Sequence, residues 1–162
     1  MGAVSIAELD RMPAGQAAEL LTTCCGSRQW VTRMLARRPF RSREALTSCG
    51  ETVWQELTPA DWIEAFGHHP RIGARDPQGL AREEQSGMTA ATAAMRASLD
   101  ELNREYEQRF GYIYIVCATG RTAEELYAIA RARLDNPPGL ELATAALEQQ
   151  KITRLRLEQL VQ

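Results

Sequence analysis

Apolar residues recur along most of the chain at spacings of three and four, the period of an amphipathic helix. The clearest stripe lies in one long segment and joins four residues: Met95, Leu99, Leu102 and Tyr106. Capping residues such as Ser5 and Thr58 mark helix starts, and proline or glycine marks helix ends. These signals predict helices that begin with a short one at Ser5 and continue over about 13–24, 30–36, 42–57, 59–66, 89–109, 122–134 and 140–161.

Two segments depart from the helical pattern. Residues 112–117 are rich in β-branched and aromatic side chains, which is typical of a strand, but no partner strand is evident. We interpret about 112–118 as one extended segment threaded through a helical core; half of an unseen strand pair is the alternative. Residues 67–88 are rich in glycine and proline and predict a long, functional connection. Gly67 is expected to end the preceding helix in a left-handed conformation.

No repeat or linker divides the chain. The sequence therefore predicts an all-α fold, a single-domain helical bundle of about seven to eight helices over residues 1–162, with one extended segment through the core.

Composition narrows the functional classes. Lysine and arginine number 19 against 21 aspartates and glutamates, so the basic surface of a nucleic-acid binder is missing and we expect no nucleic-acid partner. No apolar run approaches the roughly 20 residues that span a bilayer, and the N-terminus has no signal pattern, so we expect no membrane association. Cys24, Cys25, Cys49 and Cys117 match neither a zinc motif nor a disulfide framework, which favours a cytoplasmic setting.

The two histidines, His68 and His69, are adjacent and follow a predicted helix end. Pro70 disfavours the α conformation in the residue before it, so His69 should be extended. The negative end of the 59–66 helix favours a protonated ring, and such a histidine suits a proton donor. Two exposed loop histidines without a function are equally compatible with these residues. Zinc binding is disfavoured, because neighbouring side chains point apart and no further ligand has suitable spacing.

Three other places can bind a polar ligand. Glu84 and Gln85 offer a carboxylate beside a carboxamide, although a solvated acidic turn is the simpler interpretation. Arg156 shares a helix face with Ile152, so its guanidinium either reaches water or pairs with an anion in a pocket. The backbone groups of 112–118 either bind a planar, amide-like ligand or belong to a buried core strand.

The motifs gain specificity in combination, since they occur in a definite order. They are HPRIG at 69–73, EQSGM at 84–88, LNREY at 102–106, RFGY at 109–112, IVCA at 115–118, RLDN at 133–136 and LRL at 155–157. This combination resembles the 2-oxo-4-hydroxy-4-carboxy-5-ureidoimidazoline (OHCU) decarboxylase family. The resemblance runs from the Arg38-Pro39-Phe40 tripeptide to Leu157.

The resemblance implies an all-α enzyme, usually a homodimer, that needs no metal or organic cofactor. It implies conversion of OHCU to (S)-allantoin and carbon dioxide during uric acid degradation. The family's proton-donating histidine falls on His69, and its catalytic glutamate and arginine fall on Glu84 and Arg156. The implied substrate contacts fall on Pro70, Ala81, Glu84, Gln85, Tyr114, Ile115, Val116, Cys117 and Ala118, within the wider stretches 81–85 and 114–118.

Two departures from the family pattern stand in this chain. Arg71-Ile72-Gly73 follows His69-Pro70 where many relatives have Asp-Leu-Ala or Asp-Leu-Gly, and Ala81 stands where others have serine. The alanine argues against a side-chain role at position 81. Two rival functions remain open: a catalytically silent helical module that binds a purine derivative, and a metal-dependent hydrolase that uses His68 and His69. The joint presence of His69, Glu84, Gln85 and Arg156 favours the decarboxylase.

Overall fold

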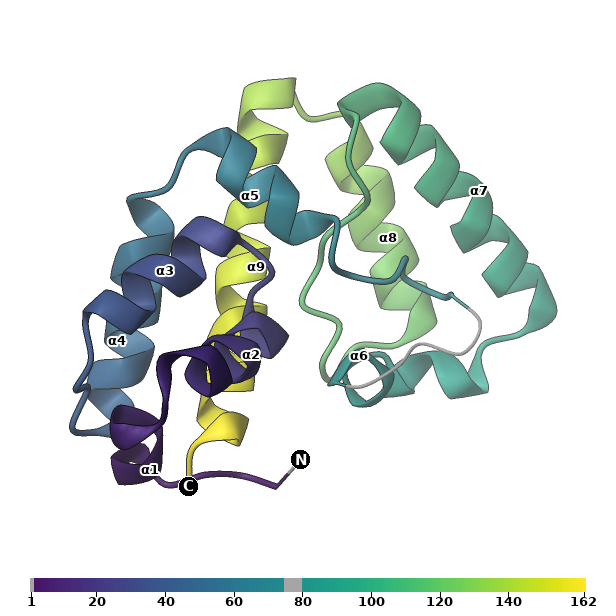
Figure 1. Ribbon diagram of the computed structural model, residues 1–162. Coiled ribbons are helices and arrows are strands. Elements are labelled where there is room, and N and C mark those ends of the chain that lie inside the picture. The colour runs from purple at the N-terminus through teal and green to yellow at the C-terminus, as the bar shows by residue number, and fades with distance from the viewer. Residues whose placement is uncertain (1, 75–79) are drawn as a thin grey trace. The chain divides into compact units, whose positions relative to one another are not determined.

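The computed structural model describes residues 2–74 and 80–162, apart from the side chains of Leu80, Thr89 and Ala90 (Figure 1). Within these ranges every regular element is helical, and the only bridge between extended residues joins Val4 to Val161. The all-α prediction is confirmed. The elements are α1 (Ile6–Arg11), α2 (Ala14–Cys24), α3 (Arg28–Ala36), α4 (Arg43–Gln55), α5 (Pro59–Phe66), α6 (Leu80–Glu84), the 3-10 helix η1 (Ser86–Ala90), α7 (Ala93–Phe110), α8 (Ala123–Leu134) and α9 (Pro138–Leu160).

Local capping chemistry explains most of the helix boundaries. Ser5 and Glu8 form a reciprocal capping box at α1, and Thr58 and Asp61 form another at α5. Gly67 ends α5 with φ −65° and ψ −13°, so the left-handed conformation expected there is wrong. This position makes no conformational demand that only glycine can meet.

The connection predicted over 67–88 is partly helical, because α6 and η1 occupy much of its second half. Its residues 75–79 lie outside the described residues. Helices of five residues contain too little of the helical period to be recognised from sequence. Gly87 marks where η1 packs closely on the start of α8, since a Cβ there would lie 2.0 Å from the Arg121 carbonyl oxygen. η1 also displaces the start of the long helix, which begins after Thr92 and not near Thr89.

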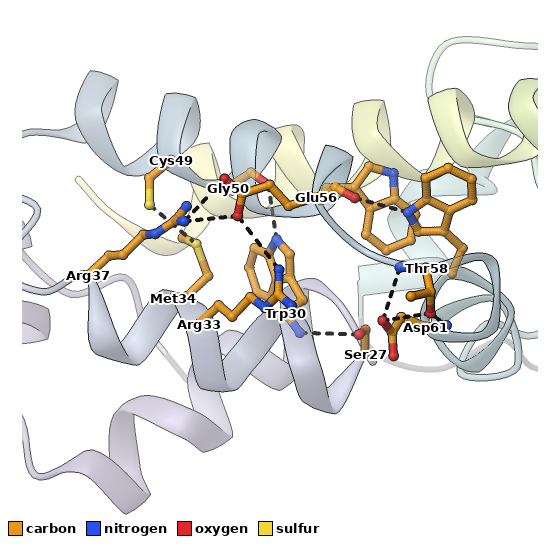
Figure 2. A network of polar contacts seen from close by, with 12 residues as sticks. Ser27, Trp30, Arg33, Met34, Arg37, Cys49, Gly50, Glu56, Thr58 and Asp61 are labelled. Atoms are coloured by element: carbon orange, nitrogen blue, oxygen red, sulfur yellow. Dashed lines mark hydrogen bonds and ion pairs between the residues drawn. The ribbon is translucent and has the colours of Figure 1, made fainter.

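The described chain forms two compact units, and the first comprises residues 1–68 and 150–162. Its core is built on Trp30 and Met34 of α3, together with Leu46 and Val53 of α4. The Trp30 indole Nε1 donates a hydrogen bond to the Gly50 carbonyl oxygen at 3.0 Å, as Figure 2 shows. Around this core, the Arg37–Glu56 ion pair and the Thr58–Asp61 cap belong to the polar contacts drawn in the same figure.

The second unit comprises residues 69–149, in which α7 and α8 lie side by side (Figure 1). Residues 113–118 have no regular secondary structure, and Tyr114, Ile115 and Val116 are buried. The prediction of an extended segment in the core is therefore confirmed. The buried side chains packed around it include Met88, Leu99, Leu102, Tyr106, Leu126 and Ala130.

A buried ion pair fixes the course of this segment. Arg133 of α8 pairs with Glu141 of α9 at 2.5 Å, and its Nη1 donates to the Ile115 carbonyl oxygen at 2.6 Å. The Tyr106 hydroxyl donates to the same carboxylate, and burial together with this hydrogen bond raises the tyrosine pKa. The network satisfies buried charges that would otherwise be costly, and in doing so it anchors the backbone at Ile115.

Candidate active site

The two adjacent histidines lie in different surroundings. The exposed His68 packs over Gly26 of the α2–α3 connection, where a Cβ would come within 2.3 Å of the imidazole Cγ. His69 is half-buried, and its Nε2 lies 2.5 Å from the Oε1 of Gln149, a fully buried residue of α9. His68 thus makes a packing contact at the surface, whereas His69 makes a specific hydrogen bond.

The turn that follows His69 is held by polar contacts from α7 and from the residue between α6 and η1. The Asn103 amide of α7 donates to the Ile72 carbonyl oxygen at 2.8 Å. The Gly73 N–H donates to the Oε1 of Gln85, between α6 and η1, at 3.0 Å. Gly73 has φ +82°, a backbone conformation that residues other than glycine rarely adopt. The candidate proton donor is therefore attached to an ordered turn.

A charged contact completes this turn on its exposed side. The Arg71 guanidinium forms a bidentate pair with the Glu107 carboxylate of α7, with nitrogen–oxygen distances of 2.8–3.1 Å. The hydrogen bonds from Arg71 and its attraction to Glu107 raise the arginine pKa. The Arg71 departure from the family pattern thus has a structural role in this chain, since it ties the turn to α7.

α6 carries the acidic part of the candidate site. Ala81 is buried near its start, Glu84 is half-buried at its last residue, and Gln85 is buried directly after it. Because the Gln85 Oε1 accepts from Gly73, this carboxamide contributes to the backbone of the His69 turn. The methyl group of Ala81 can form no hydrogen bond, so any contact between a substrate and this side chain would be apolar.

The extended segment is partly hydrogen-bonded to the protein itself. The Glu148 carboxylate of α9 accepts a hydrogen bond from the Cys117 N–H at 3.2 Å. The Arg133 guanidinium donates one to the Ile115 carbonyl oxygen. The Tyr114 hydroxyl donates to the Leu126 carbonyl oxygen at 2.9 Å, and burial raises its pKa. Two of the backbone groups that could have bound a ligand therefore have protein partners.

Arg156 belongs to the other unit, where its half-buried side chain donates from Nη1 to the Thr23 carbonyl oxygen at 3.3 Å. Arg154 of the same helix is exposed and pairs with Glu51 at 2.8 Å and with Glu158 at 3.1 Å. The structure thus gathers His69, Glu84, Gln85 and the extended segment in the 69–149 unit, and Arg156 in the other.

Neither a metal cluster nor a membrane span is found in the described parts of the chain. Across residues 2–74 and 80–162, no three histidine, cysteine or acidic side chains are placed to share a metal ion. Over the same ranges, no helix combines the length and apolar content needed to cross a bilayer.

Sequence reasoning missed the residues that position His69, namely Gln149, Asn103 and Glu107. One signal for Gln149 was available. It lies on the same helix face as Ala145, Ala146 and Ile152, all of which are buried, so a polar residue there needs a partner. That partner is 80 positions earlier in the chain, and the spacing of residues within α9 cannot identify it.

Fold and site together define a helical protein with a candidate acid–base site, in which a histidine is fixed on an ordered turn beside an acidic helix end. Residues 10–158 match the model of the OHCU decarboxylase family. The chain is 37% identical over 145 residues to the uric acid degradation bifunctional protein TTL of Arabidopsis thaliana, covering 85% of this chain and 45% of that protein. It is 31% identical over 133 residues to the 2-oxo-4-hydroxy-4-carboxy-5-ureidoimidazoline decarboxylase of Amia calva, covering 77% and 75%.

A solved structure shows the same fold. A crystal structure of OHCU decarboxylase in the presence of (S)-allantoin superposes with a TM-score of 0.81 at 33% identity, covering 88% of this chain and 96% of that one. The chain belongs to the OHCU decarboxylase family. It spans less than half the length of the Arabidopsis bifunctional protein.

Proposed function

We propose that this chain is a carboxy-lyase that converts OHCU to (S)-allantoin and carbon dioxide in uric acid degradation. The family match over residues 10–158 carries the proposal. The His-Pro histidine of that family pattern, His69, is fixed here by a hydrogen bond to Gln149. A positioned imidazole is what stereospecific protonation requires.

The proposed chemistry starts with loss of the substrate carboxylate as carbon dioxide. The electron pair of the broken carbon–carbon bond moves into the conjugated carbon–nitrogen double bond, so the substrate itself serves as the electron sink. The hydroxyl becomes a carbonyl as its hydrogen moves to the ring nitrogen. One proton added to one face of the planar anion then gives neutral (S)-allantoin. The enzyme's task is to supply that proton from a fixed direction.

We assign the proton donation to His69 and assign Glu84 to the hydroxyl or ureido group of the substrate. Arg156 is assigned to stabilising negative charge, since a guanidinium is the side chain best suited to a carboxylate. The proposed substrate contacts are those that the family pattern implies: Pro70, Ala81, Glu84, Gln85, Tyr114, Ile115, Val116, Cys117 and Ala118.

The decisive experiment supplies freshly generated OHCU and follows (S)-allantoin by circular dichroism. The wild-type chain should produce an excess of the S enantiomer, whereas His69→Ala should leave the spontaneous, racemic rate. His68→Ala is the matched control and should keep the activity. A wild-type protein that does not change the spontaneous rate would refute the decarboxylase, and full activity of His69→Ala would refute His69 as the donor.

Each of the two rival functions predicts a different measurement. A silent binding module would bind (S)-allantoin in calorimetry without accelerating OHCU loss. A metal-dependent hydrolase would lose activity on treatment with a chelator and recover it with zinc.

We further propose that residues 1–162 act as one decarboxylase domain, as a homodimer, in the cytoplasm. The family match extends across both compact units, which supports one domain.

Leu140 and Leu147 of α9 are exposed and lie seven positions apart, and they offer an apolar contact for a second copy. Light scattering on the purified chain tests the dimer, which Leu147→Glu should weaken. None of the four cysteines, all within the described residues, forms a disulfide, in keeping with a reducing compartment; cell fractionation tests it.

A further inference from the structure

Gln149 is a buried polar residue to which the proposed reaction assigns no part. Its side chain has no exposure to solvent, and the neighbouring Ala145 and Ala146 on the same helix face are buried as well. A buried carboxamide is costly unless its polar atoms are hydrogen-bonded. The Gln149 Oε1 lies 2.5 Å from the Nε2 of His69, so α9 presents this amide to the candidate proton donor.

The chemistry of the two groups defines which ring nitrogen carries hydrogen. A carbonyl-type Oε1 can only accept, so the His69 Nε2 must donate in this contact. The imidazolium meets this condition, and so does the neutral ring with its hydrogen on Nε2. The neutral ring with its hydrogen on Nδ1 does not, because two lone pairs would then face each other at 2.5 Å.

We propose that Gln149 is a positioning residue that keeps the Nε2–H of His69 in place, so that the proton delivered to the substrate leaves from Nδ1. The proposal rests on the decarboxylase function proposed above. In this step the Nδ1–H bond breaks and its electron pair stays on Nδ1. The new carbon–hydrogen bond uses the electron pair that carbon dioxide left in the planar anion. The imidazolium and the anion both become neutral, so charge and atoms balance.

The neighbouring residue of α9 supports this assignment. Glu148 accepts from the Cys117 N–H, whereas Gln149 contacts His69. Two consecutive side chains of one helix therefore fix both the proton donor and the extended segment that carries proposed substrate contacts. Because the backbone of a helix is rigid on this scale, the pair sets the direction from which the ring meets that segment.

The tautomer of His69 can be measured without any turnover. Nitrogen-15 NMR of the chain labelled at its two histidine rings, with His68→Gln to assign the signals, reports which nitrogen carries hydrogen in the neutral ring. Wild type should show the Nε2–H form. Gln149→Met, which has similar length but no acceptor of comparable strength, should shift the ring toward a mixture of both forms. Turnover should fall on the order of 10-fold or more with little change in KM, as expected for one hydrogen bond to a charged group.

Gln150→Met is the matched control, because Gln150 is the next residue of α9 and contacts Gln55 at 3.3 Å. It should change neither the His69 signals nor turnover. A wild-type ring in the Nδ1–H form overturns the proposal, and so does a Gln149→Met protein with unchanged tautomer and turnover. If Gln149→Met does not fold, the wild-type tautomer alone decides. An inactive wild-type protein refutes the decarboxylase proposal instead, and a Nε2–H ring in that protein still supports Gln149 as the group that orients His69.

Discussion

The Gln85 side chain fixes the turn after His69, because its Oε1 accepts a hydrogen bond from the Gly73 N–H at 3.0 Å. The residue is buried, and the contact joins the end of the acidic helix α6 to the His-Pro segment. A residue implied as a substrate contact by family resemblance therefore also supports the backbone beside the proposed donor.

Replacement of Gln85 by methionine should separate these two roles. The lost acceptor leaves a buried N–H unsatisfied, so the free energy of unfolding should fall by about 1–3 kcal/mol. Urea denaturation measures this, with Gln108→Met on the exposed face of α7 as a control that should be neutral. Lost turnover with unchanged stability would instead assign Gln85 to the substrate alone.

Replacement of Gly73 by alanine should destabilise the same turn. The left-handed conformation costs an alanine roughly 1–2 kcal/mol, and its Cβ would also meet Leu99 and Met88 at 3.3 Å. Gly120→Ala is the matched control, since Gly120 has a similar φ of +76° with no atom within 4 Å of the new Cβ. Denaturation of both variants should show the larger loss for Gly73→Ala, and equal losses would mean that the core absorbs the methyl group freely.

The buried Arg133–Glu141 pair should tolerate joint replacement better than single replacement. Arg133→Met leaves the Glu141 carboxylate buried without its cation, which should cost about 3–5 kcal/mol of stability. The double variant Arg133→Met/Glu141→Leu should recover part of that loss in thermal and urea unfolding. Arg121→Met serves as the surface comparison, because the Arg121–Glu125 pair is exposed at 3.9 Å and should be worth less than about 1 kcal/mol. Strictly additive losses would contradict the coupling.

Because His68 lies so close to Gly26, a substitution of His68 should restore the stability that a substitution of Gly26 removes. Gly26→Ala places a Cβ 2.3 Å from the His68 Cγ and 2.6 Å from its Cβ, so the histidine must move and stability should fall by roughly 1–3 kcal/mol. His68→Ala removes the obstructing ring and should restore most of the loss when combined with it. Gly15→Ala, with no atom within 4 Å of the new Cβ, is the neutral control. An unrelieved double variant would show that the backbone, and not His68, requires glycine.

The buried thiol of Cys25 should lower the free energy of unfolding at alkaline pH. Burial raises the pKa of its thiol from 9.0 to about 12, and hydrogen bonds from Ser27 and Thr153 oppose the shift. The native state keeps the proton that the unfolded chain loses near pH 9, so this contribution is complete below pH 9 and is lost as the pH rises toward 12. Unfolding free energies at pH 8 and pH 10 should therefore differ less in Cys25→Ala than in wild type, with Cys49→Ala as control. Equal pH slopes in all three proteins would contradict this prediction.

Local sequence determined the helical content of this protein. Ser5 with Glu8 and Thr58 with Asp61 form caps within three residues of one another, and the stripe through Leu99 and Leu102 lies on one helix face. Such contacts need no knowledge of the rest of the fold, so the sequence predicted them correctly. The unusual composition of 112–118 likewise predicted an extended segment.

Only the tertiary structure decided how the candidate site is held together. His69 could be named from its motif, but its partner Gln149 is 80 positions away, and Asn103 reaches back 31 positions to Ile72. Hydrogen bonds between distant segments leave no periodic trace in either segment, because each depends on how separate helices pack. The sequence by itself therefore determined which residues are candidates for the chemistry, whereas the packing of α6, α7 and α9 around the His69 turn determined how His69 and its turn are held.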